Sequence, residues 1–270
     1  MTAAAFEPFA TLLVLAVALI VGSFLNVCIY RLPLGQSIVF PGSHCPNCGS
    51  AVRAWQNVPI VSWIFLRARC ASCREPISWR YPAVEAVTGL MAVALWRGYG
   101  PSFAFAIAVT FSLMMIVLFF TDYDHQLLPD LVTLPGFGLG LAAAWYNPFL
   151  GEAGWPRIVA AVVGAALGSG VLWGIGALYS RLRGVEAMGF GDVKMMALIG
   201  AFSGPPGVAV TLFAASIVGA LIGLALVPLK GKTLQNALPF GCFLAPAAVV
   251  ALLWGRFLVS AYLGLVHFSP

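Results

Sequence analysis

Long apolar runs dominate the chain, and prolines, glycines and charged residues separate one run from the next. About 20 apolar residues suffice for a helix to cross a bilayer. The pattern predicts eight such helices, near residues 9–30, 83–97, 102–121, 131–147, 156–180, 193–204, 207–229 and 240–264. A tight turn at Gly204-Pro205-Pro206-Gly207 is expected to join the sixth and seventh. We therefore expect an all-α polytopic membrane protein with about eight transmembrane helices.

The composition excludes a water-soluble enzyme. Apolar residues make up 61% of the 270 residues and charged residues only 9%, whereas soluble domains carry about 25% charged residues. The same composition excludes a disordered chain and a disulfide-stapled secreted domain. The net charge of +5 is small and scattered, so no nucleic-acid partner is expected. The lipid bilayer is the expected surrounding.

Basic residues set the expected orientation, because cytoplasmic loops of membrane proteins are enriched in Lys and Arg. If the polar segment 31–82 is cytoplasmic and eight spans alternate from there, eleven basic residues lie inside and three outside. The inside set is Arg31, Arg53, Arg67, Arg69, Arg74, Arg80, Arg181, Arg183, Lys194, Lys230 and Lys232, and the outside set is Arg97, Arg157 and Arg256. The N-terminus is then outside. Three parts follow: a first span (1–30), a cytoplasmic loop (31–82) and a transmembrane core (83–270).

Two Cys-x-x-Cys pairs lie in the polar segment, Cys45 with Cys48 and Cys70 with Cys73. Each pair aims two thiolates at one point, and two pairs complete a tetrahedral zinc site with no open position. We therefore expect a zinc-ribbon-like loop with a structural Zn2+. A catalytic zinc, a redox-active pair and disulfides are the alternatives, the last disfavoured in a reducing cytosol. The two other cysteines are expected to be small packing residues within spans: Cys28 and Cys242.

Two acidic clusters stand at the ends of predicted spans. The first is Asp-Tyr-Asp at 122–124 with Asp130, and the second is Gly-Phe-Gly-Asp at 189–192. The expected topology brings both clusters to the cytoplasmic membrane edge. Because a carboxylate in or near lipid is costly, each is a functional candidate.

A pair of carboxyl groups at one edge suits aspartyl proteolysis. Two such groups a few ångströms apart share a proton, so the ionised member activates water and the protonated member polarises the scissile carbonyl. Gly189 and Gly191 would let a substrate backbone approach Asp192 closely. The alternatives are that Asp192 is a helix N-cap and that the acids of the first cluster are solvated residues at helix ends.

Taken together, the motifs resemble those of the type 4 prepilin peptidases, which are bifunctional leader peptidases and N-methyltransferases of bacterial inner membranes. The similar motifs occur in order along the chain: GSFLNV at 22–27, YRLP at 30–33, the two cysteine pairs, NVP at 57–59, RYPAVE at 80–85, DYDHQLLPD at 122–130 and GFGDVK at 189–194. Ala54 and Gln56 depart from the Pro and the acidic residue that are common beside the Trp of that loop.

The resemblance implies that Asp122 and Asp192 are the catalytic pair. It implies prepilins and pseudopilins as substrates, cut after a Gly at the cytoplasmic membrane edge, and S-adenosylmethionine as the donor that methylates the new N-terminal amine. No G-x-G-x-x-G motif follows a strand, so no Rossmann cofactor domain is expected. The rival interpretations are a peptidase without methyltransferase activity, an ion-coupled transporter and a zinc-ribbon assembly factor.

Supporting or substrate-binding candidates are Gly189, Gly191, Lys194, Asp124 and Glu85. Glu85 either holds the new ammonium group or accepts its proton, or it is only a charge stabilised at a helix start. Lys194 either contacts substrate or lipid phosphate, or snorkels to the interface.

Overall fold

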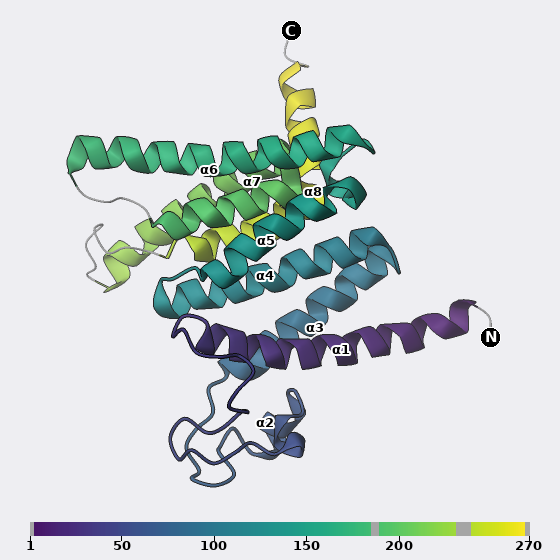
Figure 1. Ribbon diagram of the computed structural model, residues 1–270, viewed down its shortest axis with the longest axis vertical. Helices are drawn as coiled ribbons and strands as arrows, with labels where there is room; N and C mark the ends of the chain where they lie inside the picture. The colour runs from purple at the N-terminus through teal and green to yellow at the C-terminus, as the bar shows by residue number, and fades with distance from the viewer. Residues whose placement is uncertain (1–2, 185–188, 231–238, 268–270) are drawn as a thin grey trace. The chain divides into compact units, whose positions relative to one another are not determined.

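The computed structural model describes residues 3–184, 189–230 and 239–267. Its regular structure is helical (Figure 1), and the described residues contain no strand. The longer helices are α1 (Ala3–Arg31), α3 (Arg80–Tyr99), α4 (Phe103–His125), α5 (Asp130–Ala143), α6 (Trp155–Arg183), α7 (Phe190–Lys230) and α8 (Gly241–His267). The predicted all-α class is confirmed. Lys232, which was counted for orientation, lies outside the described residues.

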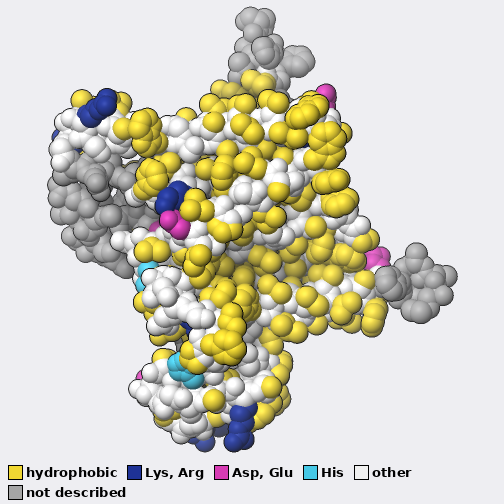
Figure 2. All heavy atoms as spheres, viewed as in Figure 1, with side chains coloured by type: hydrophobic (Ala, Val, Ile, Leu, Met, Phe, Trp, Pro, Cys, Tyr) yellow, Lys and Arg dark blue, Asp and Glu magenta, His cyan; other side chains and the backbone are white. Residues whose placement is uncertain are grey.

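Five of the described helices are long and apolar enough to cross a membrane: Glu7–Arg31, Phe103–His125, Trp155–Arg183, Phe190–Ala225 and Gly241–Leu265. Side chains on the face shown in Figure 2 are mostly hydrophobic over the helices, as a lipid-facing surface requires. α5 has 14 residues, which span about 21 Å, less than the roughly 30 Å of a hydrocarbon core. The count of eight spans, and the orientation that depends on it, therefore stay predictions.

The expected turn between the sixth and seventh spans corresponds to a kink at Gly204, where two helical segments meet within α7. α7 has 41 residues, and Gly204 alone interrupts its helical dihedrals, with φ 64°. Pro205 and Pro206 follow directly. Proline is well suited to the first turn of a helix, where its missing N–H costs nothing, so the chain resumes a helix at once.

The chain divides into two compact units, Met1–Val109 and Thr110–Pro270. In the first unit α1 packs against α3, and the polar segment follows the C-terminal end of α1 (Figure 1). The contact is close, because a Cβ at Gly22 would lie 2.9 Å from the Cα of Glu85. The Asn26 side chain also donates from Nδ2 to the carbonyl of Tyr81 at 3.1 Å.

The polar segment has little regular structure. It contains a short 3-10 helix, η1 (Ala54–Asn57), and the short helix α2 (Val61–Phe65). Two isolated β-bridges close its two cysteine turns: His44 pairs with Ala51 and Arg69 with Pro76.

The second unit is a helical bundle in which α7 packs against α5, α6 and α8. Small residues let α6 and α7 approach closely: a Cβ at Gly164 would overlap the backbone of Gly200. Such contacts are typical of helices that associate in membranes. The rings of Phe111 and Phe202 pack at a centroid distance of 5.2 Å in its core.

Candidate active site and metal centre

The four cysteines of the polar segment converge, with all four Sγ atoms within 4.8 Å of one another. The Sγ atoms of Cys45 and Cys73 are 3.8 Å apart. A tetrahedral zinc with Zn–S bonds of about 2.3 Å needs S···S distances of about 3.8 Å. Donor type and spacing therefore both fit Zn2+.

Both cysteine pairs lie in turns of the same construction. Gly49 donates its N–H to the Cys45 carbonyl at 2.9 Å, and Arg74 donates to the Cys70 carbonyl at 3.1 Å. Both donors have left-handed backbones, with φ 69° at Gly49 and 63° at Arg74. A glycine adopts this conformation freely and an arginine does not. The second turn is thus the more strained of the two.

Backbone N–H groups of the second turn point at its first cysteine. Hydrogen bonds from the backbones of Cys73 and Ser72 lower the pKa of Cys70 to about 6. A hydrogen bond with the Ser50 hydroxyl also lowers the pKa of Cys48. Because a metal binds the thiolate and not the thiol, both contacts favour metal binding at neutral pH.

Asp122 lies in the last turn of α4 and is 5% exposed. Its Oδ2 accepts a hydrogen bond from the backbone N–H of Cys242 at 2.9 Å. This N–H belongs to the first turn of α8, where backbone donors have no partner within the helix and the helix dipole favours negative charge. A Cβ at Gly241 would lie 2.8 Å from the same Oδ2. The start of α8 is therefore built around the Asp122 carboxylate.

Asp192 lies in the first turn of α7 and is partly buried. Its carboxyl group interacts electrostatically with the negative charge of Asp122. Leu128 brings the two chain segments together, because a Cβ at Gly191 would lie 3.1 Å from its Cβ and one at Gly241 would lie 3.2 Å from its Cδ2. The ends of α4, α7 and α8 thus meet at one place, and both predicted catalytic acids lie there.

The supporting candidates of this cluster have different surroundings. The Lys194 ammonium makes two hydrogen bonds to the Asp130 carboxylate, at 2.7 and 2.8 Å, and lies 5.4 Å from the ring centroid of Phe190. Asp124 is exposed at the end of α4. Among the described residues, a Cβ at Gly189 would make only an ordinary van der Waals contact, with Asp192 Oδ2 at 3.9 Å. Lys194 thus has a carboxylate partner within the protein.

Gly241 and Cys242 were not among the predicted site residues. The side chain of Cys242 is buried, as expected of a packing residue, and its Sγ donates to the Phe119 carbonyl at 3.4 Å. Its backbone N–H, however, contacts Asp122. The one available signal was the Pro-Phe-Gly sequence at 239–241, a helix start without a polar cap.

Glu85 belongs to the first unit, whereas Asp122 and Asp192 belong to the second. It is 6% exposed, and its Oε2 accepts a hydrogen bond from the backbone N–H of Ile60 at 2.7 Å. Glu85 lines a cavity of about 920 Å³ formed by α1, α3 and the polar segment.

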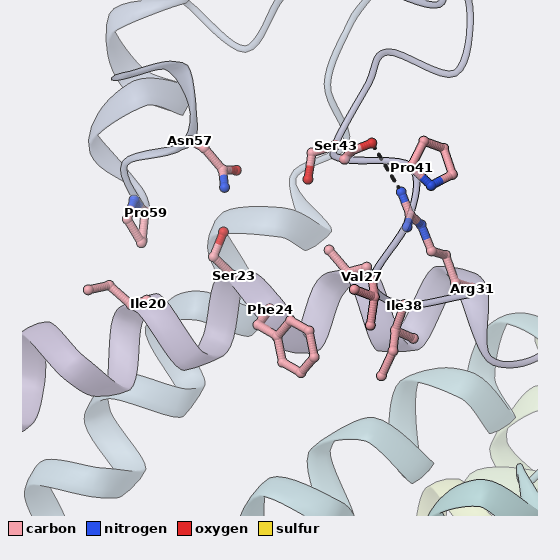
Figure 3. A pocket seen from close by; sticks show the side chains of 12 residues that line it. Ile20, Ser23, Phe24, Val27, Arg31, Ile38, Pro41, Ser43, Asn57 and Pro59 are labelled. Atoms are coloured by element: carbon pink, nitrogen blue, oxygen red, sulfur yellow. Dashed lines mark hydrogen bonds between the residues drawn. The ribbon is translucent and has the colours of Figure 1, made fainter. Parts of the chain in front are cut away.

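A smaller cavity of about 270 Å³ lies on the α1 side of the polar segment (Figure 3). Both cavities are lined by Ser23, Val27 and Arg31, so they adjoin. The Arg31 guanidinium donates to the carbonyls of Ser37 at 2.9 Å and Gly42 at 3.3 Å, which fixes the polar segment to the end of α1.

Long apolar helices, two carboxyl groups that meet at one place and a four-cysteine cluster define a helical membrane protein with a candidate aspartyl-protease site and a candidate metal site. Residues 16–99 match the bacterial Peptidase A24 N-terminal domain, and residues 109–224 match the Type IV leader peptidase family. The chain belongs to the Type IV leader peptidase family, which confirms the resemblance noted from its motifs.

Similar relatives are each called prepilin leader peptidase/N-methyltransferase. The relative from Pseudomonas putida is 37% identical over 93% of this chain and 92% of its own length. That from Aeromonas hydrophila is 36% identical over 93% of both chains. That from Pseudomonas aeruginosa is 36% identical over 93% of this chain and 92% of its own. No solved structure gives a significant match.

Proposed function

We propose that the protein is a membrane-embedded aspartyl endopeptidase that removes the leader of type 4 prepilins or pseudopilins after a Gly, and that it N-methylates the new N-terminal residue with S-adenosylmethionine. The observation that carries the proposal is the meeting of Asp122 and Asp192 beside the start of α8. The names of the full-length relatives support both activities. The proposed location is the bacterial inner membrane, with the N-terminus outside and the polar segment and both acids on the cytoplasmic face.

The two carboxyl groups have different roles in the proposed cleavage. Asp122 Oδ2 accepts a backbone hydrogen bond, so we assign Asp122 as the ionised member, which takes a proton from water as the water oxygen attacks the scissile carbonyl carbon. Asp192 then gives its proton to the carbonyl oxygen. When the tetrahedral intermediate collapses, the C–N bond breaks, the leaving nitrogen takes the proton held by Asp122, and a hydroxyl of the intermediate returns a proton to Asp192. Both groups act as general acid–base catalysts, and neither forms a covalent bond to the substrate.

The glycines beside Asp192 support access by an extended substrate. Gly189 has no side chain, and the nearest described atom to a Cβ there would be Asp192 Oδ2 at 3.9 Å, so we propose that a peptide backbone approaches Asp192 from that side. Gly191, in contrast, lies against Leu128. We therefore assign Gly189 to substrate approach and Gly191 to packing of the site.

The four cysteines, Cys45, Cys48, Cys70 and Cys73, are proposed to hold a structural Zn2+. Four thiolates leave no coordination position for a substrate, so the metal would order the polar segment without acting on the peptide bond. S-adenosylmethionine, when bound, supplies a methyl group activated by its sulfonium charge. The methyl acceptor is the amine that cleavage exposes.

The test is a two-step reaction with purified protein in lipid vesicles. A prepilin is added with or without S-adenosylmethionine, and the products are weighed by mass spectrometry. We expect loss of the leader in both reactions and a further gain of about 14 Da, one methyl group replacing one hydrogen, only with the donor. Intact prepilin in both reactions would overturn the peptidase assignment. Cleavage without the mass gain would leave a peptidase that is not a methyltransferase.

A further inference from the structure

The large cavity of the first unit has the size of a small-molecule site. Its volume is about 920 Å³, and ligand pockets typically measure about 300–1,000 Å³. Its wall includes aromatic side chains from three different elements: Tyr30 of α1, Trp63 of α2 and Tyr81 of α3. Aromatic faces of this kind suit a planar heterocycle.

The cavity wall also carries a buried carboxylate without a cationic partner. Glu85 accepts a hydrogen bond from the backbone N–H of Ile60 at 2.7 Å, but within the described part of the chain it forms no ion pair. Burying a carboxylate is costly unless a positive charge compensates it. The site is therefore incomplete as it stands, and a cationic ligand would complete it.

The backbone around this carboxylate is held in an uncommon conformation. Ile60 has φ 62°, which is a true outlier for a β-branched residue. The N–H that contacts Glu85 is the one on this residue. Strained backbone persists where the surrounding structure demands it, and it concentrates at ligand sites. The position of Glu85 is thus fixed at a structural cost.

A second buried acceptor lies on the same wall. Asn26 lines the cavity and is 1% exposed. Its Nδ2 donates to the Tyr81 carbonyl, whereas its Oδ1 has no hydrogen-bond partner among the residues that the structure describes. Buried polar atoms are nearly always paired, so an orphaned acceptor indicates a donor that the protein does not itself supply.

We propose that this cavity binds S-adenosylmethionine, with Glu85 as the counter-charge for its ammonium and sulfonium groups and Asn26 as an acceptor for one of its N–H groups. The inference rests on the proposed methyltransferase activity, for which it supplies the donor site. Cys45 and Cys70 also line the cavity. The proposed zinc would therefore support the donor site directly.

The test measures binding and needs no turnover. Zinc-loaded, full-length protein is titrated calorimetrically with S-adenosylmethionine, with S-adenosylhomocysteine and with a short peptide that has a free N-terminal Phe. The variant Glu85→Gln keeps an oxygen for the Ile60 N–H and removes the charge. We expect this variant to lower the affinity for S-adenosylmethionine at least tenfold. The affinity for S-adenosylhomocysteine should fall less, because this compound lacks the sulfonium charge. The variant Asn26→Leu should weaken both about equally, by several-fold.

Glu152→Gln is the matched control, since Glu152 is an exposed acid of the second unit, and we expect it to bind as the wild type does. Zinc content and thermal unfolding show whether each variant is folded. If Glu85→Gln weakens binding of the peptide and leaves binding of S-adenosylmethionine unchanged, Glu85 holds the acceptor amine and the inference is wrong. A wild type that methylates, with donor binding unaffected in both cavity variants, would also overturn it. A wild type that cleaves but neither methylates nor binds the donor would instead contradict the proposed methyltransferase function.

Discussion

The cysteine cluster of the first unit and the carboxylate site of the second are assembled in opposite ways. Each half of the cysteine cluster is complete within six residues, 45–50 or 70–75, because backbone hydrogen bonds close each turn locally. The carboxylate site instead joins Asp122 to Cys242, which are 120 residues apart. A local turn forms from its own sequence, whereas the carboxylate site exists only after α4, α7 and α8 have packed.

The two sites should consequently fail in different ways. Loss of a thiolate removes a ligand that helps to fold the polar segment, because a structural zinc contributes folding energy directly. Loss of a carboxyl group removes chemistry from a bundle that packing of apolar side chains already holds together. Four predictions test this difference, from the largest expected effect to the smallest.

The largest effect is expected from the paired acids. Asp122→Asn and Asp192→Asn should each lower leader cleavage by about 10³-fold or more, because each removes one of two general acid–base groups. Both variants should still methylate a pilin that is already cleaved. Asp124→Asn is the matched control, since Asp124 is exposed, and it should retain most activity. Leader loss is followed by gel shift. Normal cleavage by Asp122→Asn together with no cleavage by Asp124→Asn would contradict the assignment of Asp122 as a catalytic acid.

Removal of the metal should affect methylation more than cleavage. Purified wild type should contain about one zinc per chain, and the quadruple Cys→Ser variant none. In Cys45→Ser and Cys70→Ser, we expect methylation to fall roughly tenfold more than cleavage, because both cysteines line the proposed donor cavity and neither unit-two acid depends on them. Metal analysis and the paired mass-spectrometric assay measure this. Equal loss of both activities would mean that the polar segment supports the whole enzyme.

A series of glycine variants should separate packing from substrate approach. Gly241→Ala would place a Cβ 2.8 Å from Asp122 Oδ2, so cleavage should fall about tenfold or more through displacement of the carboxylate. Gly191→Ala would place a Cβ 3.1 Å from the Cβ of Leu128 and should lower cleavage less than Gly241→Ala does. Gly189→Ala should leave thermal unfolding unchanged and lower cleavage only by obstructing substrate.

Gly138→Ala is the control for this series, because its Cβ would meet no atom of the described residues within 4 Å. We expect normal cleavage and normal unfolding from it. If Gly189→Ala also cleaves normally, the substrate does not pass over Gly189. If Gly241→Ala is fully active, the start of α8 does not position Asp122.

The smallest effect is expected from the ion pair at the start of α5 and α7. The Asp130 side chain is 56% exposed and that of Lys194 is 26% exposed, and such pairs contribute about 0.2–1 kcal/mol. Lys194→Met and Asp130→Asn should each change cleavage less than about fivefold, and the double variant should match either single one. Kinetic assays at low and high salt measure this. Loss of activity in Lys194→Met alone would show that Lys194 contacts the substrate.

The apolar pattern was informative about helices and uninformative about their path through a membrane. Each predicted span contains a helical segment, because long apolar runs are stable as helices in lipid whatever their neighbours are. α5 has only 14 residues, and α7 is kinked at Gly204. How such helices cross a membrane depends on their packing against neighbouring helices, which the apolar pattern of a single run does not contain.

The sequence by itself determined the helical class, the cysteine cluster and the two acidic motifs, because each depends on neighbours within a few residues. The tertiary structure decided how they are completed. Only it placed the Cys242 N–H on Asp122, the Asp130 carboxylate on Lys194 and a cavity beside Glu85. The physical reason is that a backbone N–H or an enclosed volume has no residue type of its own. Such features are created where helices distant in sequence pack, so they cannot be read from the order of side chains.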